Sequence, residues 1–155
     1  MHPRITIEDP DQQEVGTMLA EADAWYNAAY PPEHNHLLDV ASLKQPGVTF
    51  HVARIDGKVV AFGALVSQQG GWGEVKRMYV DPAARGRGLG RMILAALEKE
   101  ARRVGLDGLR LETGIKQDPA IALYVSAGFH EIAPFAPYTT DPFSRFFEKR
   151  LGDRG

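Results

Sequence analysis

Six consecutive residues have the types and spacing of a site for a phosphate group. They read Arg85-Gly86-Arg87-Gly88-Leu89-Gly90 and lie between a predicted strand and a predicted helix. Glycine lets the backbone approach an anion because no Cβ stands in the way. The free N–H groups at a helix start attract negative charge, and Arg85, Arg87 and Arg91 add positive charge. We therefore predict that this loop binds a diphosphate.

Two better-known phosphate loops do not match this run. The dinucleotide-binding fingerprint needs G-x-G-x-x-G, whereas the glycines here stand at positions 86, 88 and 90. The chain contains no G-x-x-x-x-G-K-[ST], so a nucleoside-triphosphate P-loop is not indicated. The alternative is a simple turn with solvated arginines. The position between a strand and a helix favours the anion site.

Two segments of the chain resemble motifs of a known protein family. Val80-Asp81-Pro82, followed by the glycine-rich run, resembles the coenzyme A pyrophosphate loop of the GNAT superfamily, the acyl-CoA-dependent N-acyltransferases. A second GNAT motif is matched about thirty residues further on, by Gln117, Ala120-Ile121, Leu123-Tyr124 and Gly128-Phe129. The family commonly has Asn where this chain has Gln117.

The resemblance implies a fold, a cosubstrate and a set of cofactor-binding residues. The fold class is α/β (α+β), with a central mixed, mostly antiparallel sheet of about seven strands flanked by about four helices. The cosubstrate is acetyl-CoA, with no metal. The main chain of residues 78–80 pairs with the pantetheine arm, and the Val80 amide polarises the acetyl carbonyl. The implied cofactor-binding residues are Met78, Tyr79, Val80, Arg85, Gly86, Arg87, Gly88, Leu89, Gly90, Arg91 and Gln117.

Amide formation from a thioester also needs a base for the amine and an acid for the departing thiolate. Tyr124 is the candidate acid, because a phenol with a pKa near 10 is protonated at neutral pH; the alternative is a tyrosine that only packs. Glu74 is the candidate base, as in the histone-acetylating branch of the family, and strand alternation places it on the face of Met78 and Val80. The alternative for Glu74 is a solvated carboxylate at a strand end. Glu112 is the second candidate base.

The elements that must position these groups follow from hydrophobic periodicity. Alternation and turn signals predict strands at residues 4–8, 49–55, 58–66, 74–80, 108–113, 129–133 and 143–151. Helical spacing predicts helices at residues 10–29, 37–43, 89–104 and 119–127. Asp9 is the expected N-cap of the first helix, with Pro10 at its first position. The strand–helix–strand unit at residues 74–113 predicts a parallel strand pair.

Composition limits the alternatives. The 155 residues suit one domain, residues 1–155, with 152–155 as a frayed tail. The formal charge of −2 argues against a nucleic-acid-binding surface. Without cysteine, thiolate metal sites are excluded, and His34, His36 and His51 make a poor metal signature. The N-terminal residues contain no apolar targeting segment, so a cytoplasmic protein without a membrane partner is expected.

The resulting prediction is an N-acetyltransferase that moves an acetyl group from acetyl-CoA to a primary amine of a small molecule or amino-acid-like acceptor. Direct attack in a ternary complex is expected. A non-catalytic CoA-binding sensor and a protein or peptide N-acetyltransferase remain as alternatives. The sequence does not identify the acceptor. We expect residues 30–43, 68–72 and 135–144 to determine the specificity for the acceptor. The resemblance is also compatible with a homodimer.

Overall fold

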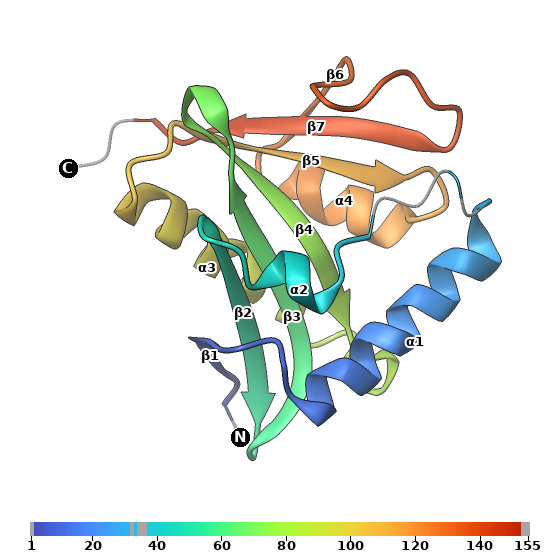
Figure 1. Ribbon diagram of the computed structural model, residues 1–155, viewed down its shortest axis with the longest axis vertical. Helices are drawn as coiled ribbons and strands as arrows, with labels where there is room; N and C mark the ends of the chain where they lie inside the picture. Colours follow the sequence, from blue (N-terminus) through green and yellow to red (C-terminus); the bar gives the residue numbers. More distant parts are fainter. Residues whose placement is uncertain (1, 32, 34–36, 153–155) are drawn as a thin grey trace.

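The protein is built around one seven-stranded sheet. The computed structural model describes residues 2–31, 33 and 37–152. The spatial order of the strands is β1-β2-β3-β4-β5-β7-β6 (Figure 1). Their bounds are Arg4–Ile7 for β1, Val48–Ile55 for β2, Lys58–Ser67 for β3, Trp72–Val80 for β4, Gly108–Gly114 for β5, His130–Ile132 for β6 and Ser144–Arg150 for β7. The β4–β5 pair is parallel and the other neighbours are antiparallel.

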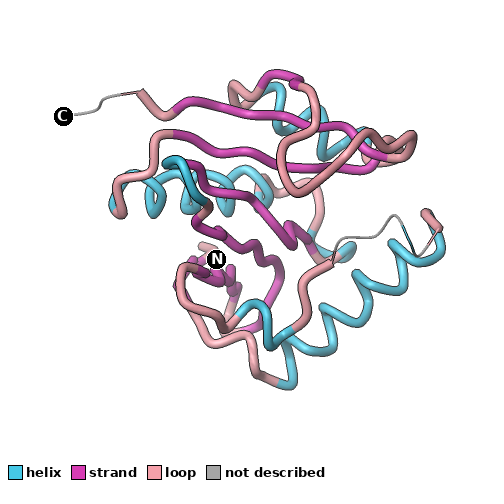
Figure 2. The backbone as a smooth tube through the Cα atoms, turned by 45° about the horizontal axis from the view of Figure 1, so that its top comes forward, coloured by secondary structure: helices cyan, strands magenta, loops and turns pink. Residues whose placement is uncertain are grey.

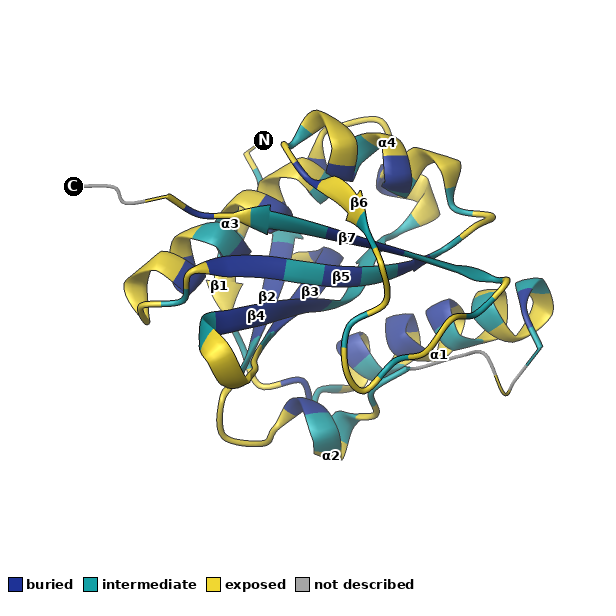
Figure 3. Ribbon diagram, turned by 90° about the horizontal axis from the view of Figure 1, so that it is seen from above, coloured by how far each residue is buried: buried dark blue, intermediate teal, exposed yellow. Residues whose placement is uncertain are grey.

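In the part of the chain that the structure describes, four α-helices cover the two faces of this sheet. Their bounds are Gln13–Ala29 for α1, Val40–Leu43 for α2, Leu89–Arg103 for α3 and Asp118–Ser126 for α4. Helices α1 and α2 lie on one face, and α3 and α4 lie on the other (Figures 1 and 3). Short 3-10 turns, Gln69–Gly71 and Pro82–Ala84, flank β4. The predicted fold class and the parallel pair are confirmed.

Each face of the sheet has its own hydrophobic core. Ile93 and Leu97 on the apolar stripe of α3 are fully buried against strands β3, β4 and β5, whereas Met92 and Val104, which the helical spacing places on the same stripe, are exposed. On the opposite face, Val15 and Leu19 of α1 pack with Phe50 and other residues of β2 and β3. Burying such apolar surface drives the assembly of the layers. Two cores on one sheet therefore fix where the helix ends lie relative to the strands.

Strands β4 and β5 separate along their length. Their ladder covers only Trp72 to Val75 on β4 and Gly108 to Leu111 on β5. Beyond these pairs β5 continues with β7 alone, and the strands diverge, so that β5 and β7 cross the direction of β2 and β3 at a large angle (Figures 1 and 2). The gap leaves the middle of the sheet open for other groups.

The first helix starts later than predicted. It begins at Gln13, with Gln12 rather than Asp9 at the N-cap. The Asp9 side chain accepts instead from the Asp11 amide at 2.9 Å, which closes a local turn. The predicted helix at 37–43 is confirmed only for its last turn, where Asp39 caps the Ser42 amide. Within the described residues, no helix is both long and apolar enough to span a membrane.

Candidate active site

The glycine-rich loop has the conformation that the sequence predicts. Asp81 accepts from the Ala83 amide and opens a 3-10 turn, after which Gly86 and Gly88 adopt φ values of +84° and +77°. These left-handed angles favour glycine. Gly88 is the N-cap of the fifteen-residue helix α3. The loop therefore delivers the positive end of a long helix to the surface.

A cavity of about 500 Å³ lies between this loop, the end of β4 and α4. Ten of the eleven cofactor-binding residues predicted above line it: Met78, Tyr79, Val80, Arg85, Gly86, Gly88, Leu89, Gly90, Arg91 and Gln117. Arg87 is exposed and is not among the lining residues. The lining also includes Trp25 and Lys116, to which the sequence analysis gave no role. Trp25 is 44% exposed, so it forms part of the rim.

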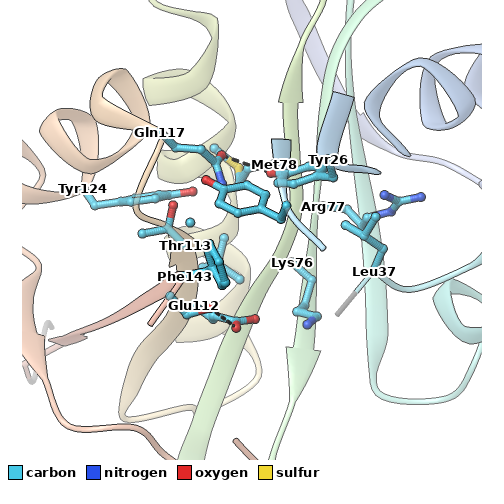
Figure 4. Close-up of a pocket in the computed structure, with 14 residues that line it drawn as sticks. Tyr26, Leu37, Lys76, Arg77, Met78, Glu112, Thr113, Gln117, Tyr124 and Phe143 are labelled. Carbon is cyan, nitrogen blue, oxygen red and sulfur yellow. Dashed lines mark hydrogen bonds between the residues drawn. The ribbon is translucent and has the colours of Figure 1, made fainter. Parts of the chain in front are cut away.

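A second, smaller cavity of about 80 Å³ opens in the gap between β4 and β5. Part of its wall is aromatic, formed by Tyr26, Tyr30 and Phe143. Lys76 on β4 and Glu112 on β5 also line it (Figure 4). The Glu112 carboxylate accepts a 2.7 Å hydrogen bond from the Ser144 hydroxyl. The smaller cavity thus combines aromatic side chains with charged residues of both signs, which are Lys76, Arg77 and Glu112.

Tyr124 lines both cavities. Its side chain is 5% exposed, and its hydroxyl points into the space between the labelled residues (Figure 4). Gly128 follows the helix at φ +99° and lets the chain turn back under α4, where the Tyr124 ring contacts Phe129. Burial raises the pKa of Tyr124 above its ordinary value, because the phenolate would lose its hydration. The hydroxyl is therefore held in its protonated form, as a proton donor must be.

The expectation that Glu74 shares a face with Met78 and Val80 is wrong. The β3–β4 register shifts between Phe62 and Ala64, so that a bulge in β4 inserts one extra residue. Arg77 stands in the bulge with φ +58°. Beyond it, the alternation of side chains is reversed. Met78 and Val80 consequently pack on the α3 face, whereas Glu74 bonds to groups on the other face.

Glu74 is buried in a hydrogen-bonded network outside both cavities. Its carboxylate accepts from the Tyr138 hydroxyl at 2.6 Å and from the Gln68 amide at 2.9 Å. The Lys76 Nζ lies 3.5 Å from Glu74 Oε2 and donates to the Tyr138 hydroxyl at 2.6 Å. Burial and the neighbouring Glu74 carboxylate raise the pKa of Tyr138. Of these partners of Glu74, Lys76 lines the smaller cavity.

The C-terminal end of helix α1 covers one side of the gap between β4 and β5. The Tyr26 hydroxyl donates to Gln117 Oε1 at 3.0 Å, and the Tyr30 hydroxyl accepts from the Lys116 amide at 2.9 Å. Tyr26 falls in the predicted helix at residues 10–29, to which the sequence analysis gave no role in the site. The dense aromatic cluster at the end of α1, with Trp25 against both tyrosines, was the available signal. Gln117, the departure from the family pattern, is therefore engaged with α1 as well as with the larger cavity.

The histidines considered for a metal form no such site in the described part of the chain. His51 is 4% exposed, and its Nε2 lies 2.9 Å from the Thr49 hydroxyl. Burial lowers the pKa of His51 because the charged imidazolium is disfavoured there. His34 and His36 lie outside the described residues. Among those that are described, no cluster of three or more possible metal ligands occurs.

Comparisons with known proteins agree with this geometry. The family model for the acetyltransferase (GNAT) family matches residues 17–129. The chain is 48% identical to the IAA acetyltransferase of Azospirillum brasilense, covering 96% of this chain and 99% of that one. A Klebsiella pneumoniae structure assigned to the acyl-CoA N-acyltransferases superposes with a TM-score of 0.86 and 41% identity, covering 97% and 98% of the two chains.

A more distant structure shares the fold alone. The Salmonella typhimurium protein yncA, solved with its cofactor acetyl-CoA, has a TM-score of 0.72 and 22% identity, covering 98% of this chain and 95% of that one. The seven-stranded sheet with its parted parallel pair, the glycine-rich start of α3 and the match of the family model over most of the chain lead to one conclusion. The chain belongs to the acetyltransferase (GNAT) family.

Proposed function

We propose that this protein transfers an acetyl group from acetyl-CoA to a primary amine of a small acceptor by direct attack in a ternary complex. The observation that carries the proposal is the position of Tyr124, which lines both the larger and the smaller cavity. The larger cavity has the volume of a cofactor site. The smaller one suits a compact acceptor rather than a protein segment. Donor and acceptor would therefore meet at this side chain.

The larger cavity is the proposed site of acetyl-CoA. The backbone N–H groups at the start of α3 would bind the diphosphate, and Arg85 and Arg91 would add charge-assisted hydrogen bonds. The pantetheine arm would run along Met78 to Val80, with the Val80 amide as donor to the carbonyl oxygen in the transition state. The relative of known structure with bound acetyl-CoA supports the choice of cosubstrate.

The smaller cavity supplies a base. Glu112 lines it, whereas Glu74 does not. We assign proton removal from the acceptor ammonium to Glu112, and to Glu74 the task of holding Lys76 and Tyr138. The neutral nitrogen then attacks the thioester carbonyl, a C–N bond forms and the C–S bond breaks. The new amide nitrogen loses its second proton to solvent, the departing thiolate takes the Tyr124 proton, and the proton held by Glu112 returns to Tyr124 through solvent.

The 48% identical relative, named for acetyl transfer to IAA, supports a small acceptor for this chain. The proposal is tested by measuring thiol release from acetyl-CoA over a panel of small amines, together with calorimetry of acetyl-CoA binding. We expect binding, and amine-dependent release of free thiol. Binding without release for any amine would instead favour the sensor, and release only with peptide amines would favour the protein acetyltransferase. A chain that does not bind acetyl-CoA would refute all three functions.

A further inference from the structure

Four of the described residues line both cavities and so surround the passage between them. They come from α1, β4, the N-cap of α4 and α4 itself, and are Tyr26, Met78, Gln117 and Tyr124 (Figure 4). With acetyl-CoA in the larger cavity and the acceptor in the smaller one, the acyl group to be transferred lies among these four residues. Their side chains therefore decide how long an acyl chain the site accepts.

Tyr26 is fixed at both its hydroxyl and its ring. The hydroxyl donates to Gln117 Oε1 at 3.0 Å. The ring meets Trp25 edge to face, with the ring centroids 5.1 Å apart, and stacks on Tyr30 at 6.2 Å. Moving Tyr26 aside would break the hydrogen bond and both ring contacts. Met78, in contrast, has an unbranched and adaptable side chain, so it sets no sharp limit on what fits beside it.

Tyr26 and Tyr124 face the same space. Burial raises the pKa of Tyr124, and the neighbouring Tyr26 raises it further, which places the two phenols close together. Burial also raises the pKa of Tyr26, so both hydroxyls keep their protons at neutral pH. In the proposed reaction the Tyr124 hydroxyl lies beside the departing sulfur. Tyr26 is therefore close to the acyl group that this sulfur carries.

We propose that the ring of Tyr26 limits the transferred acyl group to acetyl, which makes Tyr26 a specificity-determining residue for the donor. This inference rests on the proposed function and deepens it. The Val80 amide and the Tyr124 hydroxyl would fix the thioester, so an added methylene can extend only into the smaller cavity or toward α1. In the smaller cavity, of about 80 Å³, it takes the space of the attacking amine. Toward α1 it meets the Tyr26 ring, and overfilling a packed space is unfavourable.

The test compares acetyl-CoA, propionyl-CoA and butyryl-CoA as donors to one amine, as kcat/KM of the donor for thiol release. We expect the wild-type protein to lose about tenfold or more for each added methylene. Tyr26→Ala removes the ring and leaves the acid Tyr124 in place, so the rate with butyryl-CoA relative to acetyl-CoA should rise at least about tenfold. Tyr26→Phe keeps the ring and its contacts and should retain the preference for acetyl. The matched control is Tyr79→Ala, because Tyr79 lines the larger cavity and not the smaller one.

The outcomes separate this inference from the proposed function. Because the readout is a ratio between donors, a variant that merely folds poorly lowers all rates and leaves the ratio unchanged. Wild-type transfer of butyryl as fast as acetyl, or a preference that survives Tyr26→Ala, would overturn the role of Tyr26 and leave acyl transfer to an amine standing. A preference lost equally in Tyr26→Phe or Tyr79→Ala would also overturn the role of the ring. Donor binding without thiol release for any amine would overturn the proposed function, and this inference with it.

Discussion

Arg77 Nη1 and Asp23 Oδ1 are 2.6 Å apart, so that an ion pair joins the bulge of β4 to the middle of α1. The Arg77 side chain is 3% exposed, and its Nε has no hydrogen-bond partner among the described residues. Its backbone holds φ +58°, a strained angle for a residue with a Cβ. The contact therefore ties the helix that closes the gap to the point at which the strand changes face.

The first prediction concerns this ion pair. Asp23→Ala removes the carboxylate and leaves a buried guanidinium without its counter-charge, which is costly. Since Asp23 is 42% exposed on its own side, water can partly replace it, and we expect a loss of about 1–3 kcal/mol in the free energy of unfolding. Urea denaturation measures it. The exposed pair of Arg145 and Glu131 gives the control, because Glu131→Gln should cost less than about 1 kcal/mol. Equal losses for both variants would contradict the assignment.

A second prediction concerns Glu8, which anchors the first strand. Arg54 donates to both of its oxygens, at 2.9 and 3.0 Å, and these bonds lower the pKa of Glu8 from 4.5 to about 2. A lowered folded-state pKa stabilises the fold above pH 4.5, and this contribution is lost as the pH falls toward 2. Glu8→Gln should therefore cost about 2–3 kcal/mol near pH 7 and progressively less below pH 4.5.

Urea titrations of the wild type and Glu8→Gln at a series of pH values measure this window. Glu21→Gln, which alters an exposed carboxylate of α1, is the control and should leave the pH dependence as in the wild type. A constant difference between wild type and Glu8→Gln across the acid range would show that the carboxyl does not titrate as expected.

The parts of the fold predicted from sequence are those set by local patterns. Gly86 and Gly88 dictate the loop before α3 whatever surrounds it, and the spacing of apolar residues identified the helix that follows. The bulge at Arg77 could not be predicted in this way, since nothing in its own sequence distinguishes it. It depends on Gly63 of the neighbouring strand, where any Cβ would collide with Met78 Sδ at 2.7 Å.

The candidate site was predictable to the same extent. Apart from Trp25 and Tyr26, the residues that line the larger cavity belong to two segments of the chain, so short motifs indicated them. The smaller cavity is assembled from α1, β4, β5, α4 and β7, and its members are brought together by tertiary packing. Lys76 therefore had no signal of function in the sequence, Tyr26 had only the aromatic cluster around it, and alternation placed Glu74 on the wrong face.

A third prediction separates the arginines of the glycine-rich loop. Arg85 and Arg91 line the larger cavity, so removing either charge should weaken acetyl-CoA binding about tenfold, and the loss should shrink at high salt. Calorimetry with Arg85→Ala and Arg91→Ala measures the effect. Arg4→Ala, an equal change of charge on the exposed part of β1, is the control. Should Arg4→Ala weaken binding as much as Arg85→Ala, the effect would be one of net charge and not of a diphosphate site.

The fourth prediction tests Tyr124 as the acid. Tyr124→Phe keeps the ring that packs on Phe129 and removes only the hydroxyl, so kcat should fall about a hundredfold while calorimetry shows little change in acetyl-CoA affinity. Burial raises the pKa of Tyr124 above 10. Deprotonation of the Tyr124 hydroxyl should therefore not reduce kcat at any pH below 10. Val125→Ala, at an exposed neighbour on α4, is the control. A variant that retains full kcat would reduce Tyr124 to a packing role.

The last prediction decides between the two carboxylates. Glu112 lines the smaller cavity, whereas Glu74 lies behind Lys76 and Tyr138, 2.6 Å from the Tyr138 hydroxyl. Glu112→Gln should lower kcat/KM near pH 7 by about a hundredfold or more, and the loss should shrink as the pH rises, because the acceptor amine then reaches the site already neutral. Glu74→Gln should show no such recovery at high pH. Its main effect should be a higher KM for the acceptor, since Lys76 loses the carboxylate 3.5 Å away.

The pH profiles of kcat/KM for both variants distinguish a base from a residue that positions another group. A loss of kcat/KM that recovers at high pH in Glu74→Gln, and not in Glu112→Gln, would return the base to Glu74. Such a result would require the proton to pass from the acceptor through the Lys76 and Tyr138 contacts, which are the groups that separate the Glu74 carboxylate from the smaller cavity. Tyr138→Phe then interrupts that route and should show the same loss with recovery at high pH, whereas with Glu112 as the base it should show no such recovery.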